Sequence, residues 1–420
     1  MGAGFSLPED PDYTLRDSAR DSVRFAHRCL EPHEGARWRA VSTFVDPDAR
    51  IQHWHDFGDL EGPGWAANGL GGAVQLYTWG AFDSCHLLQH VALGLMDHTL
   101  DDGFVQPDGF VWGYRDTASD RLCLNFKHND DWFCPGSMAR MGLQMLWAAD
   151  ALGPGDARSE RLRLGAARTA QWLARHVPET EGWYPRRCTP TGAPYLKSAE
   201  GGDDPLWAHS ADGYHIPWLI VELLARGLPA DTDHARGMLD NAVAQGGIYG
   251  SVNHDTYDPD ENVAHSIAFR ALLRAHAVLG GGAFREFAYD SALAGLERFK
   301  MAEDRNGVAT TGLLFMEDSW DTAYLWENAE AALAYLDAYE DRREKHFLCW
   351  AVTILRGIAK HHYGPSGFLT EGVDWNNHVG REHHIGEAEF GAIKYTEPLL
   401  NNLHHIEAVM RVARLIETCT

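Results

Sequence analysis

The chain has 420 residues, of which 45% are hydrophobic and 23% are charged, the proportions of an ordinary globular protein. Its formal net charge of −24 argues against binding to DNA or RNA, because that binding depends on basic patches. No apolar run reaches the roughly 18 residues that a membrane-spanning helix needs. We therefore expect neither a nucleic-acid partner nor a membrane partner.

The first residues and the cysteines bear on the expected location of the protein. The N-terminal segment shows no basic stretch followed by an apolar stretch, so a secretory signal is not predicted from the sequence as written. Seven cysteines without a CxxC spacing favour reduced thiols. The expected location is the cytoplasm, and a signal removed from the sequence is compatible with the same pattern.

Tryptophan and histidine are both abundant, with 15 Trp and 23 His in the chain. Indole rings stack on the apolar faces of sugars, and imidazole titrates near neutral pH. Together the two enrichments favour a carbohydrate ligand and chemistry based on proton transfer.

Helical spacing of apolar residues dominates the chain, and short turns rich in Gly, Pro and Asp divide the helices into pairs. Alternating patterns typical of strands are predicted only at 109–114 and 311–316. In chain order, the predicted helices span 15–30, 83–99, 136–152, 157–176, 214–227, 232–245, 262–279, 283–300, 321–339, 342–362 and 389–416.

Long loops precede the first helix of successive pairs, and these loops are alike in composition. Each combines an acidic residue with an aromatic residue and usually with His or Asn. Their spacing is irregular, so the repeating unit is a pair of helices rather than a fixed motif. The loops lie at 127–136, 207–215, 253–262, 316–328 and 371–397.

Paired helices with such loops predict an all-α fold, an (α/α)6 or (α/α)7 toroid whose long loops gather on one face. The first helix of each pair would line the inside, and several helix N-termini would direct partial positive charge at one cleft. TPR, ankyrin and HEAT patterns are absent, which argues against an open solenoid. No linker is evident, so we expect one catalytic domain over 1–420, with 1–60 as an N-terminal arm or first hairpin.

The helix pairs, the Trp-rich loops and the segment from Asn328 to Tyr339 carry a resemblance to known enzymes. The chain resembles α/α-toroid carbohydrate-active enzymes, above all the alginate and glucuronan lyases. It is also similar, more weakly, to the unsaturated glucuronyl hydrolases and the N-acylglucosamine 2-epimerases, although the C-terminal pattern of the epimerases is not evident. The resemblance implies a polysaccharide lyase that cleaves a uronate-containing glycan by β-elimination.

Toroid lyases use Asn or Arg to neutralise the uronate carboxylate, and His or Tyr to move protons, because the C5 hydrogen is not acidic until that charge is countered. The familiar order of His, Arg and Tyr in such lyases is not reproduced cleanly here. The resemblance nevertheless implies catalytic candidates in the loops, namely His209, Asn253, His254, Tyr257, His378, Arg381 and Tyr395. The substrate-binding candidates are His128, Asn129, Trp132, Asp212, Tyr214, His215, Trp320, Trp326, Trp375 and Asn377.

Two other functions stay open from the sequence. An inverting or hydrating glycoside hydrolase needs two carboxyl groups, which could be drawn from Asp131, Asp212, Asp318 and Asp374. Most of the 60 acidic residues are expected on the solvated surface or at helix caps, and Asp212, Asp318 and Asp321 stand where N-caps are expected. A non-catalytic helical-repeat binding module would instead present a long, shallow concave face.

No catalytic metal and no cofactor are expected. The adjacent His pairs at 361–362, 383–384 and 404–405 place neighbouring rings on different faces of a helix, whereas a helical ligand pair needs i, i+4 spacing. A structural divalent cation is compatible with the sequence, as is a homodimer. The sequence also lacks a Gly-x-Ser-x-Gly motif and a phosphate-binding glycine loop.

Overall fold

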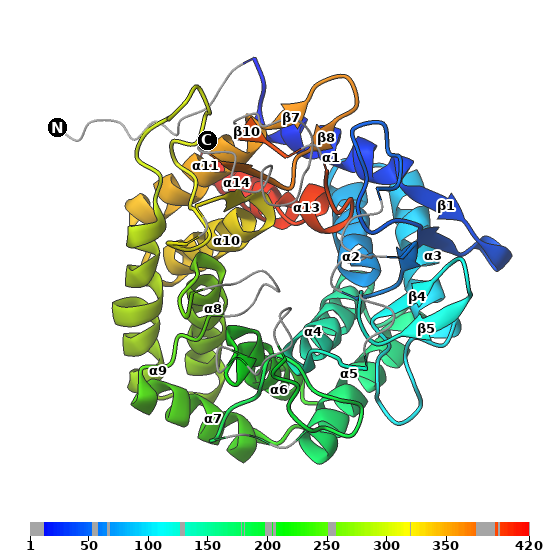
Figure 1. Ribbon diagram of the computed structural model, residues 1–420, viewed down its shortest axis with the longest axis vertical. Coiled ribbons are helices and arrows are strands. Elements are labelled where there is room, and N and C mark those ends of the chain that lie inside the picture. The colour runs from blue at the N-terminus through cyan, green and yellow to red at the C-terminus, as the bar shows by residue number, and fades with distance from the viewer. Residues whose placement is uncertain are drawn as a thin grey trace.

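The computed structural model describes residues 12–52, 58–64, 68–126, 131–177, 179, 181–197, 204, 207–250, 258–319, 321–374, 391–393 and 395–419. Within these residues, helices form two concentric layers around a central axis, as Figure 1 shows in a view along that axis. The chain is therefore an all-α toroid, which confirms the fold class predicted from the sequence. No described helix is both long enough and apolar enough to cross a bilayer.

The inner layer is built by the first helix of each pair, as predicted. Each inner helix packs on the next, and the last packs back on the first, so the described helices form a closed ring rather than an open solenoid. The inner helices are α2 (Gly69–Phe82), α4 (Pro135–Leu152), α6 (His215–Ala225), α8 (Asn262–Leu279), α10 (Leu325–Arg342), and α13 (Leu400–Leu403) followed by α14 (Ile406–Cys419).

The outer layer covers the ring from outside, and each outer helix packs on the inner helix that precedes it in the chain. Its members are α3 (His86–Asp101), α5 (Ala157–His176), α7 (Thr232–Gln245), α9 (Gly282–Phe287) with the π-helical turn Ala288–Leu293 and the 3-10 turn Leu296–Phe299, and α11 (Lys345–Ala359).

The sixth pair joins the two ends of the chain. Helix α1 (Leu15–Arg28) packs on α13 and α14, although it lies at the opposite end of the sequence. Ser18 Oγ lies 2.9 Å from His362 Nε2, and Arg356 Nη1 donates to Tyr13 O at 2.8 Å. The segment 1–60, predicted as an arm or a first hairpin, therefore supplies the outer helix of the last pair.

Local sequence explains where several helices begin and end. Pro135 occupies the first turn of α4, where a missing N–H costs nothing, and Gly153 ends the helix at φ +77°. Asp156 caps α5 by accepting a hydrogen bond from Arg158 N. Inner helices such as α8 are buried on nearly all sides, whereas outer helices such as α11 bury one face.

Short antiparallel strands lie in the loops between the helices. One sheet pairs β1 (Leu30–Pro32) with β2 (Trp38–Ala40), on either side of the 3-10 turn Glu34–Ala36. The others join β3 (Leu60–Glu61), β4 (Tyr114–Asp116) and β5 (Arg121–Cys123); β6 (Ala323–Tyr324), β9 (Gly372–Asp374) and β10 (Gly391–Ala392); and β7 (His362–Tyr363) with β8 (Phe368–Leu369).

Some sequence predictions of elements were wrong. Helix α2 was not predicted, because four glycines interrupt its apolar pattern; a Cβ on Gly71 would lie 2.5 Å from the Gln144 side chain, so the glycine allows α2 and α4 to approach closely. The helix predicted over 389–416 begins only at Leu400, since 391–392 forms a strand. Of the strands predicted at 109–114 and 311–316, only Tyr114 lies in a named strand.

Candidate functional site

One face of α4 carries polar side chains down the inside of the ring. Ser137, Arg140 and Gln144 follow i, i+3, i+7 spacing, which places them on one side of a helix. Ser137 Oγ donates to Asp212 Oδ2 at 3.1 Å, and Arg140 Nη2 lies 3.3 Å from Glu330 Oε1. The face of α4 therefore links the start of α6 to the middle of α10.

Glu330 on α10 is the centre of a buried charge cluster. Arg270 Nη1 donates to Glu330 Oε2 at 2.6 Å, and His404 Nε2 lies 2.9 Å from Glu330 Oε1. Burial alone would raise the pKa of Glu330, but Arg270, His404 and Arg140 hold it well below its usual value. Glu330 is thus a permanent anion that positions its neighbours and is not a proton donor at neutral pH.

His404 is the member of this cluster whose ordinary pKa lies near neutral pH. Burial lowers the pKa of His404, although the nearby Glu330 opposes this effect. Its imidazole is therefore neutral at pH 7. Arg140, Arg270, Glu330 and His404 all face a cavity of about 60 Å³ among α2, α4, α8, α10 and α13, which is room for a few water molecules.

The second part of the site precedes α6, at the 3-10 turn Ala211–Tyr214. Asp212 accepts from Arg186 Nη1 at 2.9 Å, and its other oxygen lies 3.0 Å from His215 Nδ1. Burial alone would raise the pKa of Asp212, but Arg186, His215 and Ser137 lower it to about 2. Asp212 is therefore ionised throughout the neutral range, although its side chain is only 1% exposed.

His215 begins α6 and is oriented by Asp212. Its Nδ1 lies 3.0 Å from both the backbone oxygen and the carboxylate of Asp212, and both of these groups can only accept. Nδ1 therefore carries a proton, and a neutral ring has its lone pair on Nε2. No partner for Nε2 is found among the described residues, and the ring stacks on Trp218 with 10° between the planes.

The two parts adjoin through α4. Burial lowers the pKa of Arg140, while Glu330 and Asp212 both oppose this effect, so its guanidinium feels both carboxylates. A Cβ on Gly136 would lie 2.2 Å from Asp212 O, so only glycine allows the start of α4 to touch the turn before α6. The first turns of α8 and α10 are also in contact, because Asn262 Nδ2 donates a hydrogen bond to Glu327 Oε2 at 2.8 Å.

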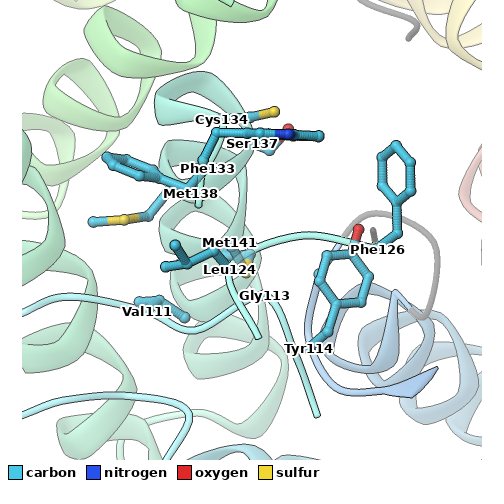
Figure 2. A pocket seen from close by; sticks show the side chains of 12 residues that line it. Val111, Gly113, Tyr114, Leu124, Phe126, Phe133, Cys134, Ser137, Met138 and Met141 are labelled. Carbon is cyan, nitrogen blue, oxygen red and sulfur yellow. The ribbon is translucent and has the colours of Figure 1, made fainter. Parts of the chain in front are cut away.

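One further hollow lies at the start of α4, and a second lies beside β5. Figure 2 shows the smaller one, about 30 Å³, with Ser137 and Met138 from α4 and with Tyr114 and Phe126 from the β4–β5 region in its wall. A wider cleft of about 700 Å³ has aromatic rings in its wall, among them that of Trp112. Such rings offer faces on which a sugar can stack.

The site residues predicted from the sequence that lie among the described residues do not all come together in one place. Asp212 and His215 come together as a hydrogen-bonded pair. Tyr214 is fully buried, and its hydroxyl donates to Gly247 O. His209 stacks on Tyr249, with ring centroids 5.5 Å apart.

Three more described candidates are buried or partly buried. Trp132 is buried, with the guanidinium carbon of Arg187 4.7 Å from its ring centroid, and Trp326 is buried at the start of α10. Tyr395 is partly buried beside the core. The remaining candidates lie outside the described residues, namely His128, Asn129, Asn253, His254, Tyr257, Trp320, Trp375, Asn377, His378 and Arg381.

The carboxylates proposed for hydrolysis have separate environments. Asp318 is exposed and pairs with Arg298 at 2.8 Å, and Asp131 is exposed beside the wider cleft, whereas Asp212 is buried. The side chain of Asp374 is outside the described set. The expected N-caps are wrong: Ser210 caps the turn that contains Asp212, and α10 begins only at Leu325.

Sequence reasoning did not single out Arg140, Arg186 and Arg270 as functional. A usable signal existed for two of them, because Arg140 and Arg270 interrupt apolar helices that are buried on nearly all sides. A charged residue in such a helix needs a buried partner of opposite charge. The partner Glu330 lies 190 residues from Arg140, so local sequence could not identify the pair.

Comparison with known proteins finds no matching protein-family model and no curated protein of similar sequence. Similarity appears at the level of structure. A D-mannose isomerase superposes with a TM-score of 0.64 at 14% identity, covering 96% of this chain and 97% of that chain. A cellobiose 2-epimerase from Bacillus thermoamylovorans B4167 has a TM-score of 0.61 at 13% identity, covering 95% and 99%.

An unsaturated glucuronyl hydrolase specific for heparin has a TM-score of 0.57 at 11% identity, covering 96% of this chain and 98% of that chain. These proteins are an isomerase, an epimerase and a hydrolase, so the lyase specificity predicted from the sequence is not confirmed. At such low identity the likeness extends to the fold alone. The chain thus shares its fold with α/α-toroid carbohydrate-active enzymes.

Proposed function

We propose that this protein is a sugar epimerase or isomerase, which moves a proton at the carbon next to the carbonyl group of a neutral sugar. The observation that carries this proposal is the Asp212–His215 pair at the start of α6. The ionised carboxylate of Asp212 accepts a hydrogen bond from His215 Nδ1, and His215 Nε2 has no partner among the described residues.

The reaction needs a base, a donor and a return path for one proton. His215 Nε2 takes the hydrogen of C2, and the electron pair of that C–H bond forms the C1–C2 double bond. The carbonyl electrons move to O1, where the developing negative charge needs a hydrogen-bond donor. Arg140 feels the charge of Asp212 and can donate an N–H group to O1, although Glu330 already compensates its charge. For a ketose the proton is given to C1, and the O2 hydroxyl proton passes to O1 as the C2 carbonyl forms. An epimer requires a proton delivered to the opposite face of C2, because return to the same face restores the starting sugar.

The charge balance of the site favours a neutral sugar over a uronate. Arg140 and Arg270 both face Glu330, and Arg270 also bonds Asp337 Oδ2 at 3.0 Å. These guanidiniums are already compensated, and the net charge of the chain is −24. A uronate carboxylate would therefore be attracted only weakly to these arginines, whereas the hydroxyl groups of a neutral sugar can form hydrogen bonds with the charged side chains.

β-Elimination remains the second candidate, because it begins with the same proton abstraction and Asp212–His215 suits it equally well. β-Elimination differs because a leaving group departs from the β-carbon, which is bonded to the carbon that loses its proton. The residues predicted to neutralise the uronate, Asn253, Asn377 and Arg381, lie outside the described residues. Hydrolysis needs a carboxylic acid that holds its proton near neutral pH, and the pKa of Asp212 and Glu330 is lowered instead.

Product analysis separates these reactions in one experiment. Neutral aldoses and disaccharides, together with glucuronan and alginate, are incubated with the protein. Sugars are resolved by chromatography, unsaturated uronate is read by its near-ultraviolet absorbance, and reducing ends are counted. An epimer or ketose from a neutral sugar supports the proposal. Near-ultraviolet absorbance from an unsaturated uronate would contradict the proposal and indicate β-elimination. New reducing ends without that absorbance would contradict it and indicate hydrolysis.

A further inference from the structure

A separate group of metal-binding side chains lies outside the ring, at the end of α3. His98 is in the last turn of that helix, and Asp102 follows one turn later, so their spacing is i, i+4. His33 comes from the turn between β1 and β2, and β2 packs on α3. The three side chains therefore bring two distant parts of the chain together.

The geometry points to a divalent-metal site formed by His33, His98 and Asp102, and we propose zinc as its preferred ion. One donor atom from each side chain lies within 4.8 Å of the others. His33 Nε2 is 4.0 Å from Asp102 Oδ2, and His98 Nδ1 contacts the same oxygen. Donors on a tetrahedral zinc lie about 3.3 Å apart, so small shifts of the two rings would seat the ion.

The donor set fits the chemistry of zinc. Two imidazoles and one carboxylate are a common zinc combination, with a fourth position open to water. The rings of His33 and His98 are 5.2 Å apart between centroids and nearly perpendicular, so they can direct nitrogen atoms at one point. Adjacent His pairs in the sequence do not indicate this site, because its helical ligands are a His and an Asp four residues later.

A buried carboxylate supports the orientation of His98. Glu61 is 1% exposed, and its Oε1 lies 3.3 Å from His98 Nε2. Among the described residues, neither oxygen of Glu61 nor His98 Nε2 makes a hydrogen bond. When His98 Nδ1 binds a metal, the ring proton is on Nε2 and faces Glu61. This is the carboxylate–histidine–metal arrangement that fixes the ring of a metal ligand.

The arginines around the cluster pair with carboxylate oxygens other than Asp102 Oδ2. Arg37 pairs with Oδ1 of Asp102, which leaves Oδ2 on the side of the two imidazoles. Arg39 and Arg115 lie 3.8 Å from Glu61, and each also has a second carboxylate partner. A bound ion would cross-link the β1–β2 hairpin to α3 and stabilise the folded protein by mass action.

The test uses the full-length protein after dialysis against a chelator, with zinc chloride alone as the titrant. Calorimetry in the presence of a competing chelator measures stoichiometry and affinity, and thermal unfolding is followed with and without zinc. We expect one zinc per chain and a higher Tm. His33→Gln should abolish the tight site, and Glu61→Gln should weaken it about 10- to 100-fold. His346→Gln, at an exposed histidine, is the matched control and should bind as the wild type does.

A second readout does not depend on any variant. Cobalt replaces zinc in such sites, and a tetrahedral site gives intense visible absorption that zinc then removes. The proposal is overturned if the wild-type protein takes up no more zinc than His33→Gln, or if cobalt gives only the weak spectrum of a hydrated ion. In that case His98 lies between Asp102 and Glu61 without an ion. Sugar turnover is not measured in either readout, so the outcome is independent of the proposed function.

Discussion

Individual charged residues in the inner helices and in the segments before α6 make up the candidate site. Arg140, Arg186, Asp212 and Glu330 are all buried, and each has an opposite charge within reach. Asp212 and His215 were singled out from the sequence as substrate-binding candidates, because their loop combines an acidic residue, aromatic residues and His, and the role of a base was not predicted for His215. Arg186 and Glu330 were not singled out, because their partners come from other segments of the chain and no local pattern records those contacts.

Replacing His215 by glutamine removes the base and keeps a polar side chain of similar size. We expect kcat to fall about 10²- to 10⁴-fold, the usual contribution of a positioned general base, with little change in unfolding temperature. His346→Gln serves as the control, because that side chain is 57% exposed on the outer helix α11. Steady-state kinetics on the sugar that gives product would show the difference. Equal losses in both variants would remove His215 from the mechanism.

Replacing Arg186 by methionine leaves the Asp212 carboxylate buried with its main cation removed. We expect the free energy of unfolding at pH 7 to fall by about 3–5 kcal/mol, the usual cost of breaking a buried pair. The exposed pair formed by Arg50 with Asp48 supplies the control, since Arg50→Met should cost less than about 1 kcal/mol. Urea unfolding measures both values.

The pH dependence of the same variant gives a second check. In the wild type the pKa of Asp212 is about 2, below the 3.8 of an ordinary aspartate, so its contribution is full above pH 3.8 and is lost between pH 3.8 and 2. Without Arg186 the buried carboxylate prefers a proton, so the deficit of the variant should shrink as the pH falls from 7 to 4. A deficit that does not change with pH would contradict this account of Asp212.

At the level of elements, the helices that could be predicted from the sequence are those whose first and last residues are marked by local signals. The prediction failed where contacts between elements determine which residues form a helix. Helices α4 and α5 were predicted because Pro135, Gly153 and Asp156 mark their ends. Helix α2 was missed because its glycines weaken the helical pattern, and those glycines are explained only by neighbours such as Gln144.

Gly136 sets the distance between α4 and the turn before α6. In Gly136→Ala the new methyl group would meet Asp212 O at 2.2 Å and Asp212 Oδ2 at 2.5 Å. We expect the turn to shift, with a lower Tm and a larger loss of kcat than of substrate affinity. Gly155→Ala is the matched control, because the methyl group added there would have no atom within 4 Å. Similar kinetics for the two variants would show that the contact is not needed for positioning.

The sixth helix pair is expected to be sensitive to acid. Burial lowers the pKa of His362 to about 4, below the 6.5 of an ordinary histidine. The unfolded chain therefore binds this proton first, and stability is lost as the pH falls from 6.5 to 4. His362→Gln removes the group, so its stability should fall less steeply over that range, as measured by unfolding midpoints at neutral and at acidic pH. Unchanged steepness would contradict the pKa, and His346→Gln is the exposed control.

At the scale of the whole molecule, the two ends of the chain close the ring. Ser18 and His362 are 344 residues apart in sequence, so no local pattern could predict that α1 belongs to the last pair. The toroid itself was predictable, because repeated helix pairs with long loops have few ways to bury their apolar faces. The chemistry was harder to predict, since it depends on which side chains of different pairs meet at the axis.

We propose that this closed ring holds a histidine base that exchanges a proton with the carbon next to a sugar carbonyl. The most direct measurement is proton NMR of a neutral sugar incubated with the protein in deuterium oxide. The account predicts that the C2 proton signal disappears with the wild type and persists with His215→Gln. Retention of that proton while the wild type converts the sugar to another product would contradict it.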